Sequence, residues 1–267
     1  MSDSAKDAAR EARESPALRL LARGGYAANG VVHLMIGAIA VVIAVGGRGE
    51  SDQAGAFTAI ASAPLGFAAL WTMALLLAAL GLWHAVAGIA VSRRSDVKKW
   101  GVRISEWGQA VIFVALGVIA AAVALGARPD ADETAQEASR GVLDIPGGAW
   151  LLAAVGVGII IGGISFVVMG VRASFRTKLS LPGGGLGRSV VALGVVGFVA
   201  KGVALGVVGV LLLIAAVRVD ASTAGGLDGA VRALLDVFAG PLLVGFVGAG
   251  FVAYGLFCLF RARYARL

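Results

Sequence analysis

Six long apolar runs constrain this chain more than any other feature of its sequence. Each run is about 20 residues or longer, the length that a helix needs to cross the hydrocarbon core of a bilayer. The runs cover residues 24–46, 65–91, 104–127, 148–171, 190–217 and 237–260. We therefore expect an all-α integral membrane protein with six transmembrane helices.

The composition supports the same fold class. Apolar residues make up 59% of the chain and charged residues 15%, against about 25% charged residues in an ordinary soluble domain. A soluble protein with so few polar side chains could not cover its surface, and a disordered chain would not carry so much apolar area. The composition therefore argues against both of these classes.

The charges between the runs predict the orientation. On one side of the membrane the sequence places 17 of the basic residues, and on the other side 5 basic and 10 acidic residues. The 17 are Lys6, Arg10, Arg13, Arg19, Arg23, Arg93, Arg94, Lys98, Lys99, Arg103, Arg172, Arg176, Lys178, Arg188, Arg261, Arg263 and Arg266. By the positive-inside rule both termini are cytoplasmic. Because these residues lie in short segments beside apolar runs, we expect them to contact anionic lipids rather than nucleic acid.

Three segments outside the runs carry further signals. The charged residues 1–23 form a cytoplasmic N-terminal segment, either a short amphipathic helix on the membrane surface or a flexible tail. The uncharged stretch 53–91 is too long for one span, and Pro64 should separate a short re-entrant or interfacial piece from the spanning helix. An interfacial helix is also expected in the last outer loop, from the helical spacing of Leu227, Val231, Leu234 and Leu235.

The runs repeat as three hairpins, over residues 24–92, 100–174 and 189–262. In every run two small residues are seven apart: Gly30 and Gly37, Gly81 and Gly88, Ala110 and Gly117, Gly163 and Gly170, Gly202 and Gly209, Gly248 and Gly255. Seven residues are nearly two helical turns, so each pair shares one helix face. Such faces favour close helix packing, and flexible or ligand-lining positions are the alternative. Three hairpins of one orientation are parallel repeats, for which we expect a pseudo-threefold arrangement.

The repeat carries a family resemblance. The first repeat begins with Arg23-Gly24-Gly25-Tyr26 and its second helix ends in a Gly-x-x-x-x-Arg pattern from Gly88 to Arg93. Three tandem glycine-rich modules of this kind resemble a bacterial membrane-protein family catalogued as domain of unknown function 1206, over about residues 20–265. The resemblance implies a multi-pass protein of the bacterial inner membrane with six spans. It implies no activity and no catalytic residues.

Polar residues inside the runs form one candidate site. Asn29, Gln109 and Lys201 occupy the same position in the three repeats, so a polar ring would lie in the cytoplasmic half of the bundle. Glu106 lies one helical turn from Gln109 and could pair with Lys201; the alternative partners for Glu106 are Arg103 and Lys99. The ring could bind an anionic group or relay protons, or its members could be hydrogen-bond links between helices.

The two histidines form a second candidate site. His33 and His84 lie about nine and eight residues from the cytoplasmic ends of their runs, and so at similar depth. Two neutral imidazoles facing each other could ligate haem b. The alternatives are a proton-linked role and simple hydrogen bonding between helices.

The remaining chemistry points away from catalysis. The single cysteine, Cys258, cannot form an intramolecular disulfide, and we expect it to be buried packing. The runs hold no nucleophile–base pair, metal-ligand cluster or paired carboxylates, so we expect neither an enzyme nor a metal site. A structural or accessory membrane protein that binds lipids or partners is the first hypothesis. A small-solute or ion transporter or channel, lined by the polar residues above, is the alternative.

Overall fold

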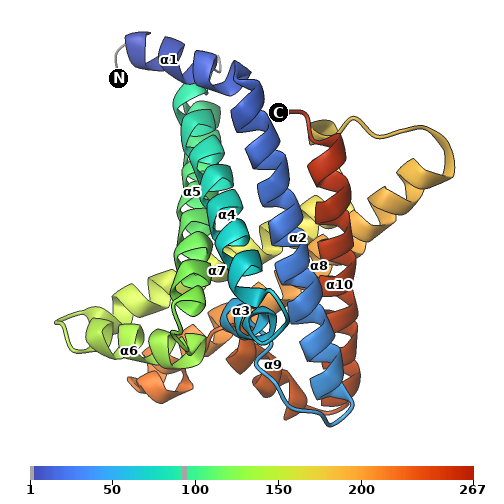
Figure 1. Cartoon of the computed structure of the whole chain (residues 1–267). Coiled ribbons are helices and arrows are strands. Elements are labelled where there is room, and N and C mark those ends of the chain that lie inside the picture. The colour runs from blue at the N-terminus through green and yellow to red at the C-terminus, as the bar shows by residue number, and fades with distance from the viewer. Residues whose placement is uncertain (1–2, 92–94) are drawn as a thin grey trace. The chain divides into compact units, whose positions relative to one another are not determined.

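A computed structural model describes residues 3–91 and 95–267, and in those residues it is built from helices (Figure 1). The long helices are α2 (Pro16–Ala44), α4 (Gly66–Ala90), α5 (Asp96–Ala124), α7 (Gly148–Val171), α8 (Gly184–Arg218) and α10 (Gly240–Tyr264). The shorter elements are α1 (Asp3–Glu14), α3 (Gln53–Ala61), α6 (Ala131–Leu143), α9 (Leu227–Leu235) and the 3-10 turns Ser174–Lys178 and Ala221–Thr223. Arg93 and Arg94 lie outside the described residues, as do the side chains of Lys6, Arg10 and Lys98.

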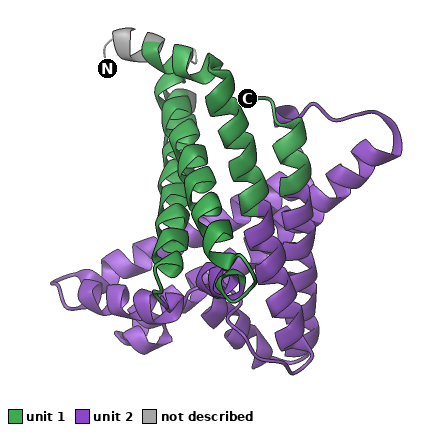
Figure 2. Cartoon of the chain, viewed as in Figure 1, with its two compact units in different colours: residues 1–29, 60–127, 258–267 green, residues 30–59, 128–257 purple. Residues whose placement is uncertain are grey.

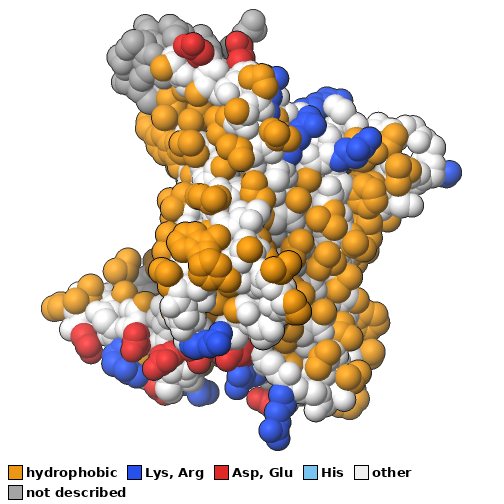
Figure 3. Space-filling view, in the orientation of Figure 1, with side chains coloured by type: hydrophobic (Ala, Val, Ile, Leu, Met, Phe, Trp, Pro, Cys, Tyr) orange, Lys and Arg blue, Asp and Glu red, His pale blue; other side chains and the backbone are white. Residues whose placement is uncertain are grey.

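The six long helices confirm the predicted spans. Each contains a window that is long and apolar enough to cross a membrane, and hydrophobic side chains cover them on the face seen in Figure 3. Helices α2 and α8 begin at Pro16 and Gly184, about seven residues earlier than expected, because their polar first turns continue the apolar helix. The chain is a multi-pass membrane protein.

The short helices fall where the sequence indicated them. Helix α3 ends before Pro64, which separates it from α4, and α9 begins at Leu227 in the last outer loop. Residues 3–14 form α1, which agrees with the helical alternative for the N-terminal segment. That these helices lie on the membrane surface stays a prediction.

Two compact units make up the fold, and each is described by itself (Figure 2). The first unit contains residues 1–29, 60–127 and 258–267, and the second contains residues 30–59 and 128–257. The first therefore holds the helix pair α4 and α5. The second holds the pair α7 and α8, together with the part of α2 from Gly30 onward and the part of α10 up to Phe257.

Within the first unit, α4 and α5 approach so closely that only small residues fit at the crossing. A methyl group on Gly81 would lie 3.0 Å from the carbonyl oxygen of Ala110, and one on Gly117 would lie 3.0 Å from the carbonyl oxygen of Ala74. Gly88 faces the indole ring of Trp107 in the same way. The backbones therefore touch along the predicted face of small residues.

Within the second unit, α7 and α8 also approach closely at small residues. A methyl group on Gly163 would lie 2.6 Å from the carbonyl oxygen of Gly202, and one on Gly202 would lie 2.5 Å from that of Gly163. Gly156 and Gly209 stand in the same reciprocal relation, at 3.0 and 2.8 Å. Small side chains permit this approach, which strengthens van der Waals packing in lipid.

The third pair joins the first repeat to the last. A methyl group on Gly37 would lie 2.6 Å from the carbonyl oxygen of Gly248, and one on Gly255 would lie 2.7 Å from that of Gly30. In all three pairs, the second helix of one repeat therefore packs against the first helix of the next. The helix-packing interpretation of these glycines is confirmed.

A repeated turn precedes the second helix of each repeat. One residue of each turn has a positive φ: Leu65 at 64°, Gly147 at 79° and Ala239 at 59°. The next residue is a glycine whose N–H donates over 2.9 Å to a carbonyl three residues earlier: Gly66 to Ala63, Gly148 to Ile145 and Gly240 to Val237. A Cβ on any of these glycines would meet a carbonyl oxygen of the preceding helix. The three-repeat organisation is thus visible in the local backbone, while the pseudo-threefold arrangement stays a prediction.

Substitution of one crossing glycine should weaken the fold selectively. Gly163→Ala should lower the free energy of unfolding by about 1–3 kcal/mol, because the new methyl group forces two helix backbones apart. Gly158→Ala is the matched control, since Gly158 lies on the same helix and a methyl group there meets nothing within 4 Å. Thermal unfolding in detergent measures both. An equal effect of the two variants would contradict the proposed role of the crossing.

Candidate functional site in two buried polar clusters

The first unit contains a chain of hydrogen-bonded polar groups that we name the His84 cluster: Tyr26, His84, Glu106 and Arg261. His84 Nδ1 lies 2.7 Å from Glu106 Oε2, and His84 Nε2 lies 3.3 Å from Tyr26 Oη. Arg261 Nη2 donates to Tyr26 Oη over 3.0 Å, and its guanidinium carbon lies 4.1 Å from the centre of the tyrosine ring. Tyr26 and His84 are each 3% exposed. Four helices, α2, α4, α5 and α10, therefore meet at one hydrogen-bonded chain.

The spacing of small residues explains why His84 is at this crossing. His84 stands three residues after Gly81 and four before Gly88, so all three share one face of α4. The two glycines bring the α5 backbone close, and His84 then meets α5 side chains on both sides. Glu106 accepts its hydrogen bond, and the ring of Phe113 stacks on the imidazole at 5.5 Å between ring centres and 21° between ring planes.

The donors in this chain indicate the tautomer of His84. A guanidinium only donates, so Tyr26 Oη accepts from Arg261 and its own proton is available to His84 Nε2. The imidazole proton then lies on Nδ1 and is donated to the carboxylate of Glu106, an assignment made from the hydrogen-bond network. In this arrangement both ring nitrogens of His84 have a protein partner.

The second unit contains the His33 cluster: His33, Phe166, Lys201, Phe251 and Tyr254. Lys201 Nζ lies 3.2 Å from His33 Nε2, and it lies 4.8 and 5.4 Å from the ring centres of Tyr254 and Phe166. His33 is 1% exposed, and its ring stacks on Phe251 at 5.8 Å and 14°. Because an ammonium only donates, a charged Lys201 requires His33 Nε2 to accept. Aromatic faces around the ammonium add cation–π attraction.

The two clusters are versions of one repeated position. Each long helix carries a small residue, a ring or leucine three residues later, and a glycine four residues after that. The middle residues are His33, His84, Phe113, Phe166, Leu205 and Phe251. In the pair α4 and α5 the histidine is on the second helix of a repeat, whereas in the pair α10 and α2 it is on the first. Each histidine thus stacks on the phenylalanine at the aligned position of the helix against which it packs.

The members of the predicted polar ring belong to different units. In the first unit, Asn29 Nδ2 donates to Cys258 Sγ over 3.4 Å, and Gln109 Nε2 donates to the Ser105 carbonyl of its own helix over 3.3 Å. Cys258 is buried, as expected. Lys201 belongs to the second unit. The ring and the Lys201–Glu106 pair span both units and stay predictions.

The haem hypothesis also spans the two units and stays a prediction. In the structure His84 faces Phe113 and His33 faces Phe251, and each imidazole has a polar partner in its own unit. Sequence reasoning missed Tyr26 and Arg261, which it read as part of a motif and as a surface cation. The one available signal was the repeat alignment, which places Tyr26 and Glu106 at equivalent positions.

A third cluster lies outside the spans, in the second unit. The Ser51 N–H and hydroxyl donate to Asp228 Oδ1 over 2.8 and 3.1 Å, and Arg232 Nε donates to Asp228 Oδ2 over 2.7 Å. Burial raises the pKa of Asp52 to about 6, assisted by the negative charges of Asp228 and Glu50 and opposed by the Gly55 N–H that donates to it. Over residues 3–91 and 95–267, no group of three acidic, histidine or cysteine residues is arranged to hold a metal ion.

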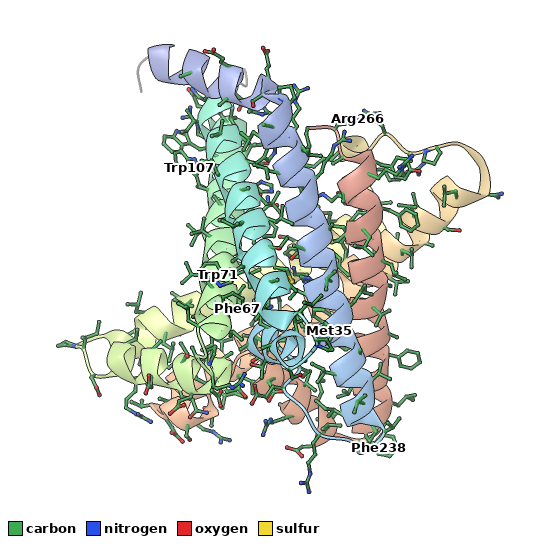
Figure 4. All side chains as sticks on the ribbon, viewed as in Figure 1. Met35, Phe67, Trp71, Trp107, Phe238 and Arg266 are labelled. Carbon is green, nitrogen blue, oxygen red and sulfur yellow. The ribbon has the colours of Figure 1, made fainter. Side chains whose placement is uncertain are left out.

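The outer surface of the helices suits a lipid environment. Trp100, Trp107 and Trp150 are 52%, 36% and 83% exposed, and Phe238 in the turn before α10 is 99% exposed. Figure 4 shows Phe238 projecting away from the helices beside it. Exposed aromatic rings near the ends of spans are typical of the membrane–water interface.

Comparison with known proteins gives a family and an uncharacterised relative. The model of the family described as Domain of Unknown Function (DUF1206) matches three times, at residues 24–90, 107–173 and 196–265. The uncharacterized protein YxxB of Bacillus subtilis (strain 168) is 24% identical over 258 residues, which cover 94% of this chain and 93% of that protein. No solved structure matches the chain.

The raised pKa of Asp52 predicts a pH dependence of stability. Between about pH 4 and 6 the folded protein keeps a proton that the unfolded chain has released, so this carboxyl contributes less stability as the pH rises through that window. Asp52→Asn keeps an acceptor for Gly55 and should raise stability at pH 7 by about 2 kcal/mol. Hydrogen exchange in α3 and α9 measures the effect. Asp236→Asn, at an exposed position, should change little; no gain in Asp52→Asn would refute the assignment.

Proposed function

This chain belongs to the family described as Domain of Unknown Function (DUF1206), and we propose that it is a structural or accessory protein of the bacterial inner membrane. In this proposal it binds lipids or protein partners and is not an enzyme. It has no nucleic-acid partner and needs no cofactor.

One observation carries the proposal: intramembrane polar side chains lie against protein groups of their own unit. Glu106 bonds to His84, and Asn29 bonds to Cys258. Lys201, whose charge is costly to place in a membrane, meets His33 and two aromatic rings. Such bonds between helices are worth about 1 kcal/mol each and fix which helix faces meet. This is the pattern of a protein whose polar groups hold its shape.

The proposed orientation has both termini in the cytoplasm. The basic residues at the ends of the spans then face anionic headgroups, which attract each Lys or Arg by about 1 kcal/mol. The acidic connections between α2 and α4, α5 and α7, and α8 and α10 face the opposite side. Lipid binding on the cytoplasmic side follows from this orientation.

Transport of a small solute or ion is the second candidate. Its site would comprise Asn29, Glu106, Gln109 and Lys201 in the cytoplasmic half of the bundle. The observation that favours it is that Glu106, Gln109 and Lys201 are only partly buried although they lie within spans. A charged residue at such a position marks an ion or substrate path in many membrane proteins.

Native mass spectrometry of gently extracted protein, with an absorbance spectrum of the same sample, tests the proposal. We expect protein that carries lipid adducts and shows no Soret band. A stoichiometric adduct that is not lipid would contradict the accessory function and favour transport. A Soret band that is lost in His33→Phe or His84→Phe would instead establish haem ligation.

Two substitutions of Lys201 separate a structural role from a role of its charge. The aligned residues of the other repeats are Asn29 and Gln109, so Lys201→Gln is the matched variant that retains a donor for His33. For a structural role, Lys201→Met should lower the free energy of unfolding by about 1 kcal/mol, and Lys201→Gln by less. Thermal unfolding in detergent measures both. If both variants fold like the unmodified protein but lose solute flux in proteoliposomes, the transport candidate replaces the accessory one.

A further inference from the structure

We propose that the His84 cluster is a proton-binding site, in which His84 takes up one proton at Nε2 and releases it again. The ligand is H⁺, and the site comprises the imidazole, the carboxylate of Glu106, the hydroxyl of Tyr26 and the guanidinium of Arg261. This inference goes beyond the accessory function, which needs these groups only as links between helices.

The site has one charge of each sign before the proton arrives. Arg261 is the cation and Glu106 the anion, and the neutral imidazole between them completes a chain of three hydrogen bonds of 3.0, 3.3 and 2.7 Å. Histidine is the side chain that ordinarily changes its charge between about pH 5 and 8. The carboxylate of Glu106 lies 2.7 Å from His84 Nδ1, and it can accept a hydrogen bond from this nitrogen in both the neutral imidazole and the imidazolium. Both protonation states therefore have a bonded arrangement.

The proton balance of the step is simple. In the neutral state, Tyr26 O–H donates to Nε2, and Nδ1–H donates to Glu106. When a proton from water adds to Nε2, the imidazolium donates through both nitrogens. Tyr26 Oη then accepts from Nε2–H and from Arg261 Nη2–H, and its own proton turns away from His84. The cluster changes from net zero to net +1, and no bond other than N–H forms.

The elements packed around His84 define the groups that influence this proton. Helix α2 contributes Tyr26 and Asn29, α5 contributes Glu106, and α10 contributes Arg261 and Cys258. On α4 itself, the neighbouring Trp83 lies under the guanidinium of Arg13 from α1, at 5.2 Å. The carboxylate of Glu106 favours the bound proton, whereas the charge of Arg261 opposes it.

Arg261, at one end of the hydrogen-bonded chain, makes the His84 cluster a proton-binding site and not a proton path. A guanidinium stays protonated under all ordinary conditions, so Arg261 cannot accept the proton that Tyr26 would pass on. A proton that reaches Nε2 therefore leaves again without passing on through Arg261. The aromatic face of Phe113 covers the imidazole, which limits other routes.

Nitrogen-15 NMR of protein labelled at histidine observes this site directly. The chain has two histidines, so His33→Phe leaves the signals of His84 alone, and phenylalanine already occupies the aligned position 113. At pH 9 we expect one protonated nitrogen, Nδ1, and one unprotonated nitrogen, Nε2. On acidification to pH 5 we expect both nitrogens to become protonated, with reversal on return to pH 9.

Two further variants distinguish the proton site from packing. Glu106→Gln removes the carboxylate but not the hydrogen-bond acceptor, and should weaken the imidazolium signal at pH 6 relative to its parent. His84→Phe introduces the side chain that Phe166 and Phe251 have at the aligned positions of the other repeats, so this variant should fold. Its difference in thermal unfolding between pH 5 and 9 should be smaller than that of the His33→Phe parent, and the part that Asp52 contributes should remain in both.

The proposal is wrong if His84 keeps one protonated nitrogen from pH 9 to pH 5. It is also wrong if the proton at pH 9 lies on Nε2, because Tyr26 would then not be its donor. Either result would leave the accessory function untouched, since that function is tested by the bound adducts of the unmodified protein.

Discussion

The close approach of helix backbones at paired glycines is the interaction on which the rest of this structure depends. At Gly163 and Gly202 a methyl group would already overlap the opposite carbonyl oxygen, and the same holds at Gly37 and Gly248. In a bilayer there is no hydrophobic force between helices, so packing of this kind and a few hydrogen bonds must hold them together. Glycine contacts of this kind join the three helix pairs, α4 with α5, α7 with α8 and α10 with α2.

The close approach of the helices also determines where buried histidines lie in this structure. In each long helix a ring or leucine stands between the two small residues, at the place where the neighbouring backbone is nearest. Four helices have phenylalanine or leucine there, and two have His84 and His33. A histidine at this position is buried against the next helix, and so it must find polar partners there. Glu106 and Tyr26 supply them in one unit and Lys201 in the other.

Much of the fold could be predicted from the sequence. The length of the apolar runs indicated the six spans, and the seven-residue spacing of glycines indicated the packing faces, because both follow from helix geometry. Pro64 and the apolar spacing around Val231 located α3 and α9. The family comparison then matched the three repeats that the spacing had indicated.

The partners within the candidate site could not be predicted, for a physical reason. The sequence shows which residues share a helix face but not which two helices meet. The glycine contacts join neighbouring repeats. Glu106 therefore meets His84 of the preceding repeat, a partner that the sequence had not indicated. Arg261 was unexpected because an arginine at the end of a span ordinarily faces headgroups.

Packing between the last repeat and the first is the central claim of this account, and disulfide formation between α2 and α10 tests it most directly. Ala44 Cβ lies 3.7 Å from the position of a Cβ on Gly245, close to the mean Cβ separation of about 3.8 Å in disulfides. We predict that Ala44→Cys combined with Gly245→Cys gives a rapid intramolecular cross-link under mild oxidation. Ala44→Cys combined with Gly158→Cys should give none. Failure of the first pair to cross-link, in protein that is folded, would contradict the packing of successive repeats described here.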